Sequence, residues 1–250
     1  MSLALVLLTL ASFIAGAQNA LAGGGSFLVF PALLFAGLNP LAANITSTIA
    51  LFPGQVTTSF AGRSLVEGAA GLSIGMLVGI SLVGGGVGAV LLLATPVSIF
   101  THLVPYLVLF ATAVFAWGSF VAKKRAEDEP AHISPRGAMA AQVIIAIYGG
   151  YFGGGIGILM LAALTAAGLS VRHAGATKNM LAGVINVAAV VIFIVQTSIH
   201  WRVVLLVAVA AIAGGQVGVY MLRRINETVL RVGITAIGVM LTIGLFLHAG

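Results

Sequence analysis

Amide and hydroxyl side chains recur at helical spacing in two apolar stretches of the chain. Thr48 and Gln55 follow Asn44 by four and eleven residues, nearly one direction on a helix of about 3.6 residues per turn. A shift of 131 residues carries Thr48 onto Asn179, and the same shift carries Gln55 onto Asn186. Both stretches therefore present a face of hydrogen-bonding groups, which suits either a polar solute or a neighbouring helix.

A basic residue stands beside the second of these faces. Lys178 directly precedes Asn179, and no Asp or Glu lies near it in the sequence. An ammonium group without a fixed counter-ion suits a site that receives its negative charge from a bound anion. The alternative is that Lys178, which is close to Arg172, extends to an aqueous interface while its stem stays in apolar surroundings.

Acidic residues are informative because they avoid the apolar stretches. All five lie between these stretches or at their ends, at Glu67, Glu127, Asp128, Glu129 and Glu227. The stretches therefore hold no carboxylate to relay protons or bind a cation, and the chain has no cysteine to supply thiolate ligands. We expect no metal and no cofactor. Among the histidines, His173 is best placed to act as a protonation switch.

Two runs of three glycines, at 23–25 and 153–155, interrupt long apolar stretches. Each glycine disfavours helix by about 1 kcal/mol relative to alanine, so we expect the chain to break there. New helices should start at about Ser26 and about Ile156, and their first N–H groups, with the positive end of the helix dipole, would form a cradle for an anion. The alternative is that these glycines only permit close helix packing.

The composition places all these residues in a lipid bilayer. Of 250 residues, 60% are hydrophobic and 6% are charged, against about 45–50% and about 25% in soluble domains. The chain has eleven Lys and Arg against five Asp and Glu. The basic residues lie mostly in short loops, which indicates that they orient the protein in the membrane rather than bind nucleic acid. Apolar segments long enough for helices fall at roughly 3–37, 41–62, 68–94, 98–122, 137–169, 173–198, 201–222 and 227–248.

Two of these segments are too long for one crossing. Residues 3–37 as a single helix would extend about 52 Å, whereas the hydrocarbon core is about 30 Å thick. Because 3–37 and 137–169 each contain a glycine run, we expect each to form a hairpin that begins and ends on the same side. The predicted fold class is all-α: a polytopic membrane protein with two inverted-topology repeats, each a glycine-broken hairpin plus three transmembrane helices.

The basic residues test the hairpins independently. With two hairpins, ten of the eleven fall on one side, or nine if Lys178 lies within the membrane, and only Arg202 falls on the other. Eight simple spans would give six against five. The first distribution is a strong positive-inside signal. We therefore predict a first transmembrane repeat at 1–122, a cytoplasmic linker at 123–136 and a second repeat at 137–250, with both termini in the periplasm.

Glycine-rich and polar motifs recur through nearly the whole chain. They are Ala22-Gly23-Gly24-Gly25-Ser26, Gly37-Leu38-Asn39-Pro40, Gly153-Gly154-Gly155, Gly168-Leu169, Ala176-Thr177-Lys178-Asn179 and His200-Trp201. In these motifs the sequence resembles the TauE/SafE sulfite-exporter family. The resemblance implies transport of sulfur-containing anions such as sulfite and organosulfonates, mostly across bacterial inner membranes. One departure is that Ala162 and Val171 stand where the first half has Pro31 and Pro40.

The residues and the resemblance together predict a secondary transporter that exports a small sulfur oxyanion, such as sulfite or an organosulfonate, by alternating access. The alternatives are a gated anion channel with the same site, and a serine hydrolase with Ser26 as nucleophile, which lacks a partnered histidine at membrane depth. A homodimer is the default assembly. The expected substrate-binding residues are Gly24, Gly25, Ser26, Asn44, Thr48, Gln55, Gly154, Gly155, Thr177, Lys178, Asn179 and Asn186.

Overall fold

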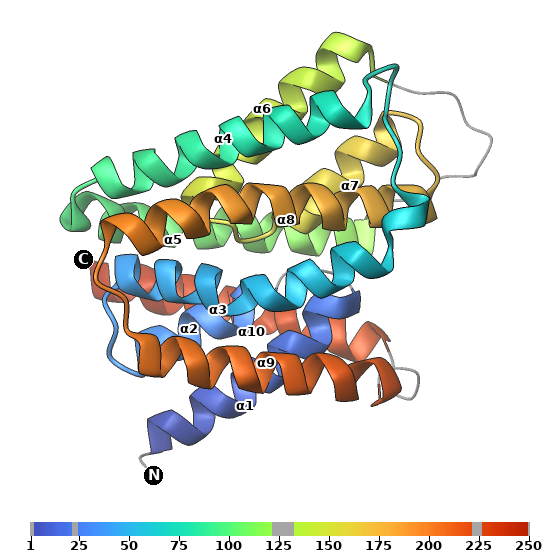
Figure 1. The fold of residues 1–250 in the computed structure, drawn as a ribbon. Coiled ribbons are helices and arrows are strands. Elements are labelled where there is room, and N and C mark those ends of the chain that lie inside the picture. The colour runs from blue at the N-terminus through green and yellow to red at the C-terminus, as the bar shows by residue number, and fades with distance from the viewer. Residues whose placement is uncertain (1–2, 22–24, 122–132, 222–226, 250) are drawn as a thin grey trace.

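In a computed structural model of the chain, the described residues fold into a bundle of helices (Figure 1). The structure describes residues 3–21, 25–121, 133–221 and 227–249, and no β-strand occurs in these ranges. The helices are α1 (Leu3–Leu21), α2 (Ser26–Phe35), α3 (Pro40–Ala61), α4 (Ile74–Ala94), α5 (Val97–Ala116), α6 (Pro135–Tyr151), α7 (Ile156–Ala166), α8 (Val171–Gln196), α9 (Trp201–Met221) and α10 (Glu227–Ala249). The all-α architecture expected from the sequence is confirmed.

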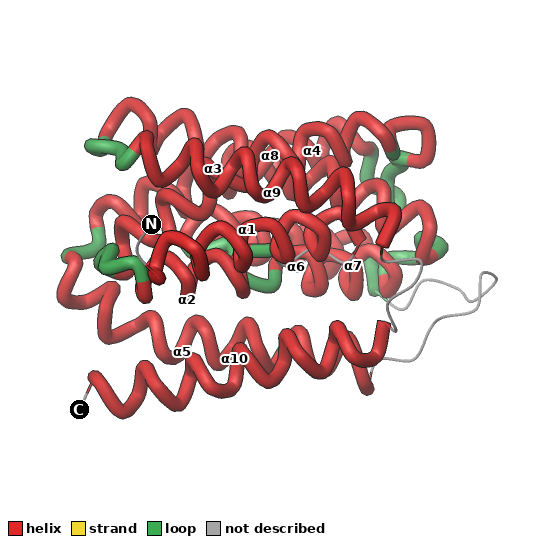
Figure 2. The backbone as a smooth tube through the Cα atoms, turned by 90° about the horizontal axis from the view of Figure 1, so that it is seen from below, coloured by secondary structure: helices red, strands yellow, loops and turns green. Residues whose placement is uncertain are grey.

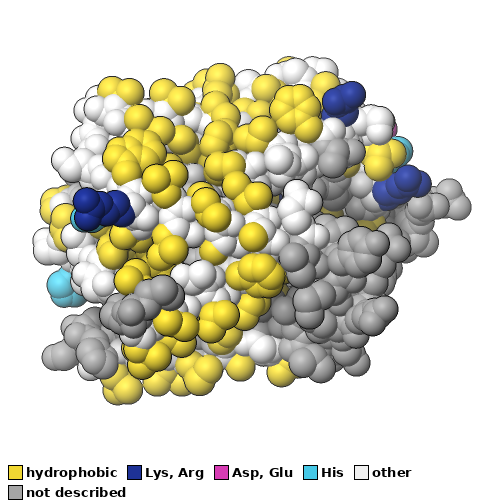
Figure 3. Space-filling model, turned by 60° about the horizontal axis from the view of Figure 1, so that its bottom comes forward, with side chains coloured by type: hydrophobic (Ala, Val, Ile, Leu, Met, Phe, Trp, Pro, Cys, Tyr) yellow, Lys and Arg dark blue, Asp and Glu magenta, His cyan; other side chains and the backbone are white. Residues whose placement is uncertain are grey.

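The bundle has the length and the surface of a membrane protein. Three segments of the described chain are each long and apolar enough to cross a bilayer alone, Ile74–Ala94, Val97–Phe120 and Val171–Gln196. Figure 3 shows apolar side chains spread across one face of the molecule, and the basic side chains visible there lie near its two ends. An apolar surface of this extent is stable in lipid rather than in water.

The two overlong apolar segments are each divided into two helices. The second helices begin at Ser26 and Ile156, where the glycine runs predicted new starts. α2 has 10 residues and α7 has 11, so each extends only about 15 Å, half of the hydrocarbon thickness. In Figure 1, α1 starts at the left end and α2 returns toward it, whereas α6 starts at the right end and α7 returns there.

α2 and α7 end in the same way, at corresponding positions of the two halves. Gly37 and Gly168 adopt left-handed φ angles of +93° and +104°, a conformation that favours glycine. In both turns the amide of the next leucine bonds the carbonyl five residues earlier, at 3.1 Å. The following helices start behind a capping side chain, Asn39 for α3 and Ser170 for α8.

Helices pack through glycines at two corresponding interfaces. α1 packs against α9, and α6 packs against α4. A Cβ atom added at Gly16 of α1 would lie 1.8 Å from the carbonyl oxygen of Ala211, and one added at Gly88 of α4 would lie 2.1 Å from that of Ile147. The backbones therefore approach too closely for any side chain, as small residues permit in membranes. α3 and α8 contact each other, and α5 and α10 lie side by side at one edge (Figure 2).

The helix ends separate the described basic residues. α3 ends, and α6 and α8 begin, at the right-hand end in Figure 1, and these ends lead to Arg63, Arg136 and Arg172. α9 begins at the left-hand end with Arg202 as its second residue, and the start of α1 and the end of α10 lie there too. We call the right-hand end the basic end. The residues at 123–125, 223 and 224 lie outside the described part of the chain.

Candidate functional site

A small cavity lies inside the bundle where the two broken hairpins meet α3 and α8. Its volume is about 30 Å³, room for about two water molecules. Four of the residues expected from the sequence line it: Ser26, Gln55, Lys178 and Asn179. We call this space the central cavity. It brings together residues from α2 and α3 of the first half and from α8 of the second.

Two helix N-termini face the central cavity. Ser26 is the first residue of α2, and Ile156 and Gly157 are the first residues of α7, and all three line the cavity. The first N–H groups of a helix have no acceptor within that helix, and they carry the positive end of its dipole. Both half-helices therefore direct hydrogen-bond donors and partial positive charge toward the same space, as a bound anion requires.

The second glycine run has a conformational role. Gly153 and Gly155 both have φ angles of +77°, and Gly155 is the residue that precedes the first turn of α7. A residue with a side chain is strained in this left-handed region, so the turn into α7 depends on glycine. Close helix packing alone does not account for this run. Gly25 is buried at the start of α2, and Gly24 lies outside the described residues.

Lys178 brings a basic side chain to the central cavity. Its side chain is 5% exposed, so it is buried rather than extended to the aqueous interface. Asn179 follows it on α8 and also lines the cavity, and no Asp or Glu is among the described lining residues. The charge, the two helix N-termini and the amides of Gln55 and Asn179 together define a site with the electrostatics for a small anion.

The polar faces of α3 and α8 contact each other directly. The Asn186 side-chain amide donates to Gln55 Oε1 at 2.5 Å, and these two residues are the pair related by the shift of 131. Ser59 Oγ donates to the backbone oxygen of Asn179 at 2.8 Å. Asn186 does not line the central cavity, so it joins the helices, whereas Gln55 does both.

The remaining expected residues lie around the central cavity rather than on its wall. Asn44 donates to the Tyr151 carbonyl at 3.0 Å, and Thr48 donates to the carbonyl of Asn44 at 3.0 Å. Asn44 and Gly154 line a separate pocket of about 20 Å³, which Ser26 also lines. Ser26 therefore stands between the two spaces.

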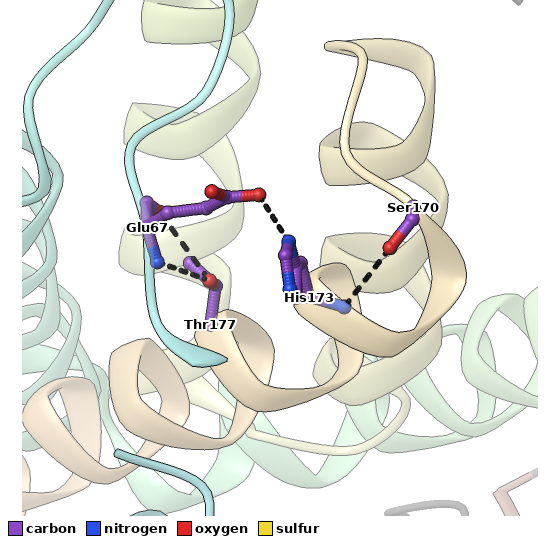
Figure 4. Close-up of polar contacts among 4 residues, drawn as sticks. All are labelled: Glu67, Ser170, His173 and Thr177. Atoms are coloured by element: carbon purple, nitrogen blue, oxygen red, sulfur yellow. Dashed lines mark hydrogen bonds and ion pairs between the residues drawn. The ribbon is translucent and has the colours of Figure 1, made fainter. Parts of the chain in front are cut away.

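Thr177 belongs to a contact between the halves near the basic end (Figure 4). Its hydroxyl bonds the backbone N–H and carbonyl of Glu67, at 3.2 and 3.3 Å. The Glu67 carboxylate pairs with His173 Nδ1 at 2.5 Å, and Ser170 caps the same helix. The loop between α3 and α4 is thus bonded to the first two turns of α8, directly before Lys178.

Aromatic side chains fill the space beyond Ser26 on the side away from the basic end. The rings of Phe30 and Phe152 meet edge to face with centroids 5.6 Å apart, and those of Phe100 and Tyr151 with centroids 5.8 Å apart. Phe30 and Phe152 also line the pocket of about 20 Å³. Large aromatic rings in edge-to-face contact therefore occupy this side of Ser26.

Sequence reasoning missed several lining residues, Asn19, Thr58, Gly153 and Ala182. Thr58 could have been found, because it follows Gln55 by three residues and so continues the polar face of the same helix. Asn19 is a polar residue in an apolar stretch, four positions before the first glycine run. Ala182 gave no signal, because an alanine on a buried helix face has no distinguishing chemistry.

Broken helices whose N-termini meet a buried cation within a bundle of membrane helices define the class of the protein, a polytopic membrane transporter. The family model for the sulfite exporter TauE/SafE matches residues 8–246. The chain belongs to this family, which confirms the resemblance seen in its motifs. The family consists of membrane transporters and not of enzymes, so a hydrolase with Ser26 as nucleophile is excluded.

Similar proteins carry the same general description. The chain is 33% identical over 220 residues to the probable membrane transporter protein ORF9 of a Sinorhizobium species, covering 86% of this chain and 81% of that protein. It is 27% identical over 241 residues to a probable membrane transporter protein of Haemophilus influenzae, covering 95% of this chain and 92% of that protein. It is 26% identical over 212 residues to the probable membrane transporter protein YfcA of Escherichia coli K12, covering 83% of this chain and 76% of that protein.

Proposed function

We propose that the protein is a secondary transporter that exports a small sulfur oxyanion, such as sulfite or an organosulfonate, by alternating access. The observation that carries the proposal is that Lys178 and the N-termini of α2 and α7 line one cavity. A sulfonate or sulfite oxygen accepts hydrogen bonds from backbone N–H groups and balances the charge of a buried ammonium. The family's description as sulfite exporters supports this substrate class.

We propose that the basic end faces the cytoplasm of a bacterial inner membrane. Arg63, Arg136 and Arg172 lie at that end, against Arg202 at the other, and loops rich in Lys and Arg stay in the cytoplasm. The linker at 123–136 is then cytoplasmic and both termini are periplasmic. The halves 1–122 and 137–250 are two inverted repeats, which is the arrangement that supports alternating access around a site at mid-depth.

The site is too small for its substrate in the present conformation. A volume of about 30 Å³ holds about two waters, whereas sulfite has four heavy atoms. Binding therefore requires the two hairpin tips to separate from α3 and α8. A movement of one repeat against the other would widen the space on one side at a time, with the contact between Gln55 and Asn186 at the place where the repeats meet.

A thermal-stability screen of the purified protein tests the proposal. We expect sulfite or an organosulfonate, among sulfite, sulfate, thiosulfate, sulfoacetate and taurine, to raise the melting temperature by several degrees, because a ligand that binds only the folded state stabilises it. Lys178→Ala and Asn179→Ala should abolish the rise. Arg202→Ala, which removes a positive charge at the other end, should keep it. The proposal is wrong if both cavity variants retain the wild-type response.

A further inference from the structure

A second space adjoins the central cavity. It has a volume of about 300 Å³ and lies between α1, α3 and α9, and we call it the α3–α9 groove. Asn19 and Thr58 line both the groove and the central cavity. Among the described residues, these two side chains therefore stand between the two spaces.

The groove lies toward the basic end. Its residues on α3 run from Leu51 to Thr58, and α3 continues only to Ala61 before the chain reaches Arg63. On α9 they include Gln216, near the C-terminal end of that helix at Met221. α3 and α9 both end on the right in Figure 1, where α8 begins with Arg172 as its second residue. The positive potential of this end attracts anions.

Polar side chains line part of the groove, among apolar residues such as Leu51 and Ile212. Thr57 and Gln216 are exposed polar side chains within it, next to the shared Asn19 and Thr58. Gly54, in the interior of α3, widens it: a Cβ atom added there would have no heavy atom within 4 Å. An anion in the groove therefore has amide and hydroxyl donors beside it, which offset part of the cost of its desolvation.

A second groove lies beside α4 and α8, which are the counterparts of α9 and α3, and it differs in both respects. This groove of about 340 Å³, between α3, α4 and α8, contains Val184 and Leu82, which correspond to Pro53 and Ile212 by shifts of 131 and 130. Ser59 is its one polar side chain among the described lining residues. None of those residues lines the central cavity. It offers an anion neither a polar wall nor a passage.

We propose that the α3–α9 groove is the vestibule through which the anion passes between the basic end and the central cavity, with Asn19 and Thr58 as the passage. The inference rests on the proposed function, because it presumes that an anion binds at Lys178. The inference adds the route of the anion and the end from which the anion enters. The protein is open toward the basic end, while the aromatic side chains around Phe30 and Phe152 close the opposite side.

Single cysteines test the route, because the chain contains none. We expect Thr57→Cys to react with an anionic methanethiosulfonate reagent at least tenfold faster than Val187→Cys, which lies in the apolar groove and is similarly placed on a central helix. The reaction should be fast in inverted membrane vesicles and slow in right-side-out vesicles. Equal rates for the two variants, or fast labelling from the opposite side, would overturn the inference.

A substitution that fills the groove tests its use in transport. A Cβ atom at position 54 meets no atom within 4 Å, and leucine favours helix over glycine, so we expect Gly54→Leu to keep the fold. We expect the rate of sulfoacetate or sulfite transport to fall at least tenfold, while the thermal stabilisation by the same anion remains. Gly79→Leu on α4, which also meets open space, is the matched control and should transport normally.

The outcomes separate the two proposals. If the wild-type protein responds to no anion in binding or transport, the proposed function fails and the vestibule with it. If the wild type binds and transports while Gly54→Leu transports equally fast, the site stands and the vestibule is wrong.

Discussion

α3 and α8 occupy corresponding places in the two halves but contribute different chemistry. Both follow a broken hairpin, both start behind a capping side chain, and they meet through Gln55 and Asn186. α8 brings Lys178 to the central cavity, and its sequence has no proline. α3 brings only neutral groups to that cavity, and it contains Pro53 beside Gly54, where the vestibule widens. The second half therefore contributes the basic side chain that binds the anion, and the first half contributes the vestibule through which the anion enters.

The largest expected effect comes from the charge on α8. The shift of 131 places Ser47 of α3 where α8 has Lys178. We expect Lys178→Ala to weaken anion binding by about tenfold to a hundredfold, because a hydrogen bond to a charged group contributes about 1.5–3 kcal/mol. Ser47→Ala should change affinity less than about twofold. Titration calorimetry measures both, and equal losses would mean that the halves share the anion's charge equally.

A smaller effect, on stability, distinguishes two glycines. Gly155→Ala should lower the free energy of unfolding by about 1–2 kcal/mol, because φ is +77° there. A Cβ at this position would lie 3.5 Å from Ala111, an ordinary contact, so the cost is conformational. Gly54→Ala on α3 should instead stabilise by up to about 1 kcal/mol. Thermal unfolding in detergent compares them, and the same sign for both would contradict the account.

A smaller change in stability is expected from the hydrogen bond between Gln55 and Asn186, which joins the two halves. In a double-mutant cycle of Gln55→Ala and Asn186→Ala, we expect a coupling energy of about 0.6 kcal/mol, as is typical of hydrogen bonds within membrane proteins. The cycle is measured by unfolding of the two single variants and the double variant. Strict additivity would show that the bond between the two amides contributes nothing to holding α3 on α8.

The smallest effect is expected at the pair near the basic end. Glu67 and His173 are both partly exposed, so Glu67→Gln should change stability by less than about 0.5 kcal/mol. Thr177→Val, which removes the hydroxyl that bonds the Glu67 backbone, is the companion variant. A loss of several kcal/mol on Glu67→Gln would show that this pair, and not the backbone contact, fixes the loop on α8.

Much of this arrangement could be predicted from the sequence because it depends on local rules. Glycine runs in overlong apolar segments predicted helix starts at Ser26 and Ile156, and the structure has both. The helical spacing placed Gln55 on a polar face, and Lys178, which has no acidic residue near it in the sequence, was expected near that face. These inferences needed only the helical period, the helix propensity of glycine and the cost of burying charge.

Other details depend on how distant segments meet, which no local pattern encodes. Asn186 was expected to bind the substrate, but its side chain bonds Gln55 instead, because α3 and α8 cross at this point. Thr177 was expected at the site, but it faces the loop between α3 and α4. Its hydroxyl bonds Glu67. Thr48 instead bonds the carbonyl one turn earlier, a common local alternative.

Anion exchange in proteoliposomes tests the central claim most directly, that an anion binds between the two broken-helix ends beside Lys178 and is carried across. The measurement is the uptake of labelled sulfite into vesicles with and without unlabelled sulfite inside. We predict that preloading accelerates uptake by the wild-type protein and that Lys178→Ala abolishes the acceleration. Uptake that is insensitive both to preloading and to Lys178→Ala would contradict the account.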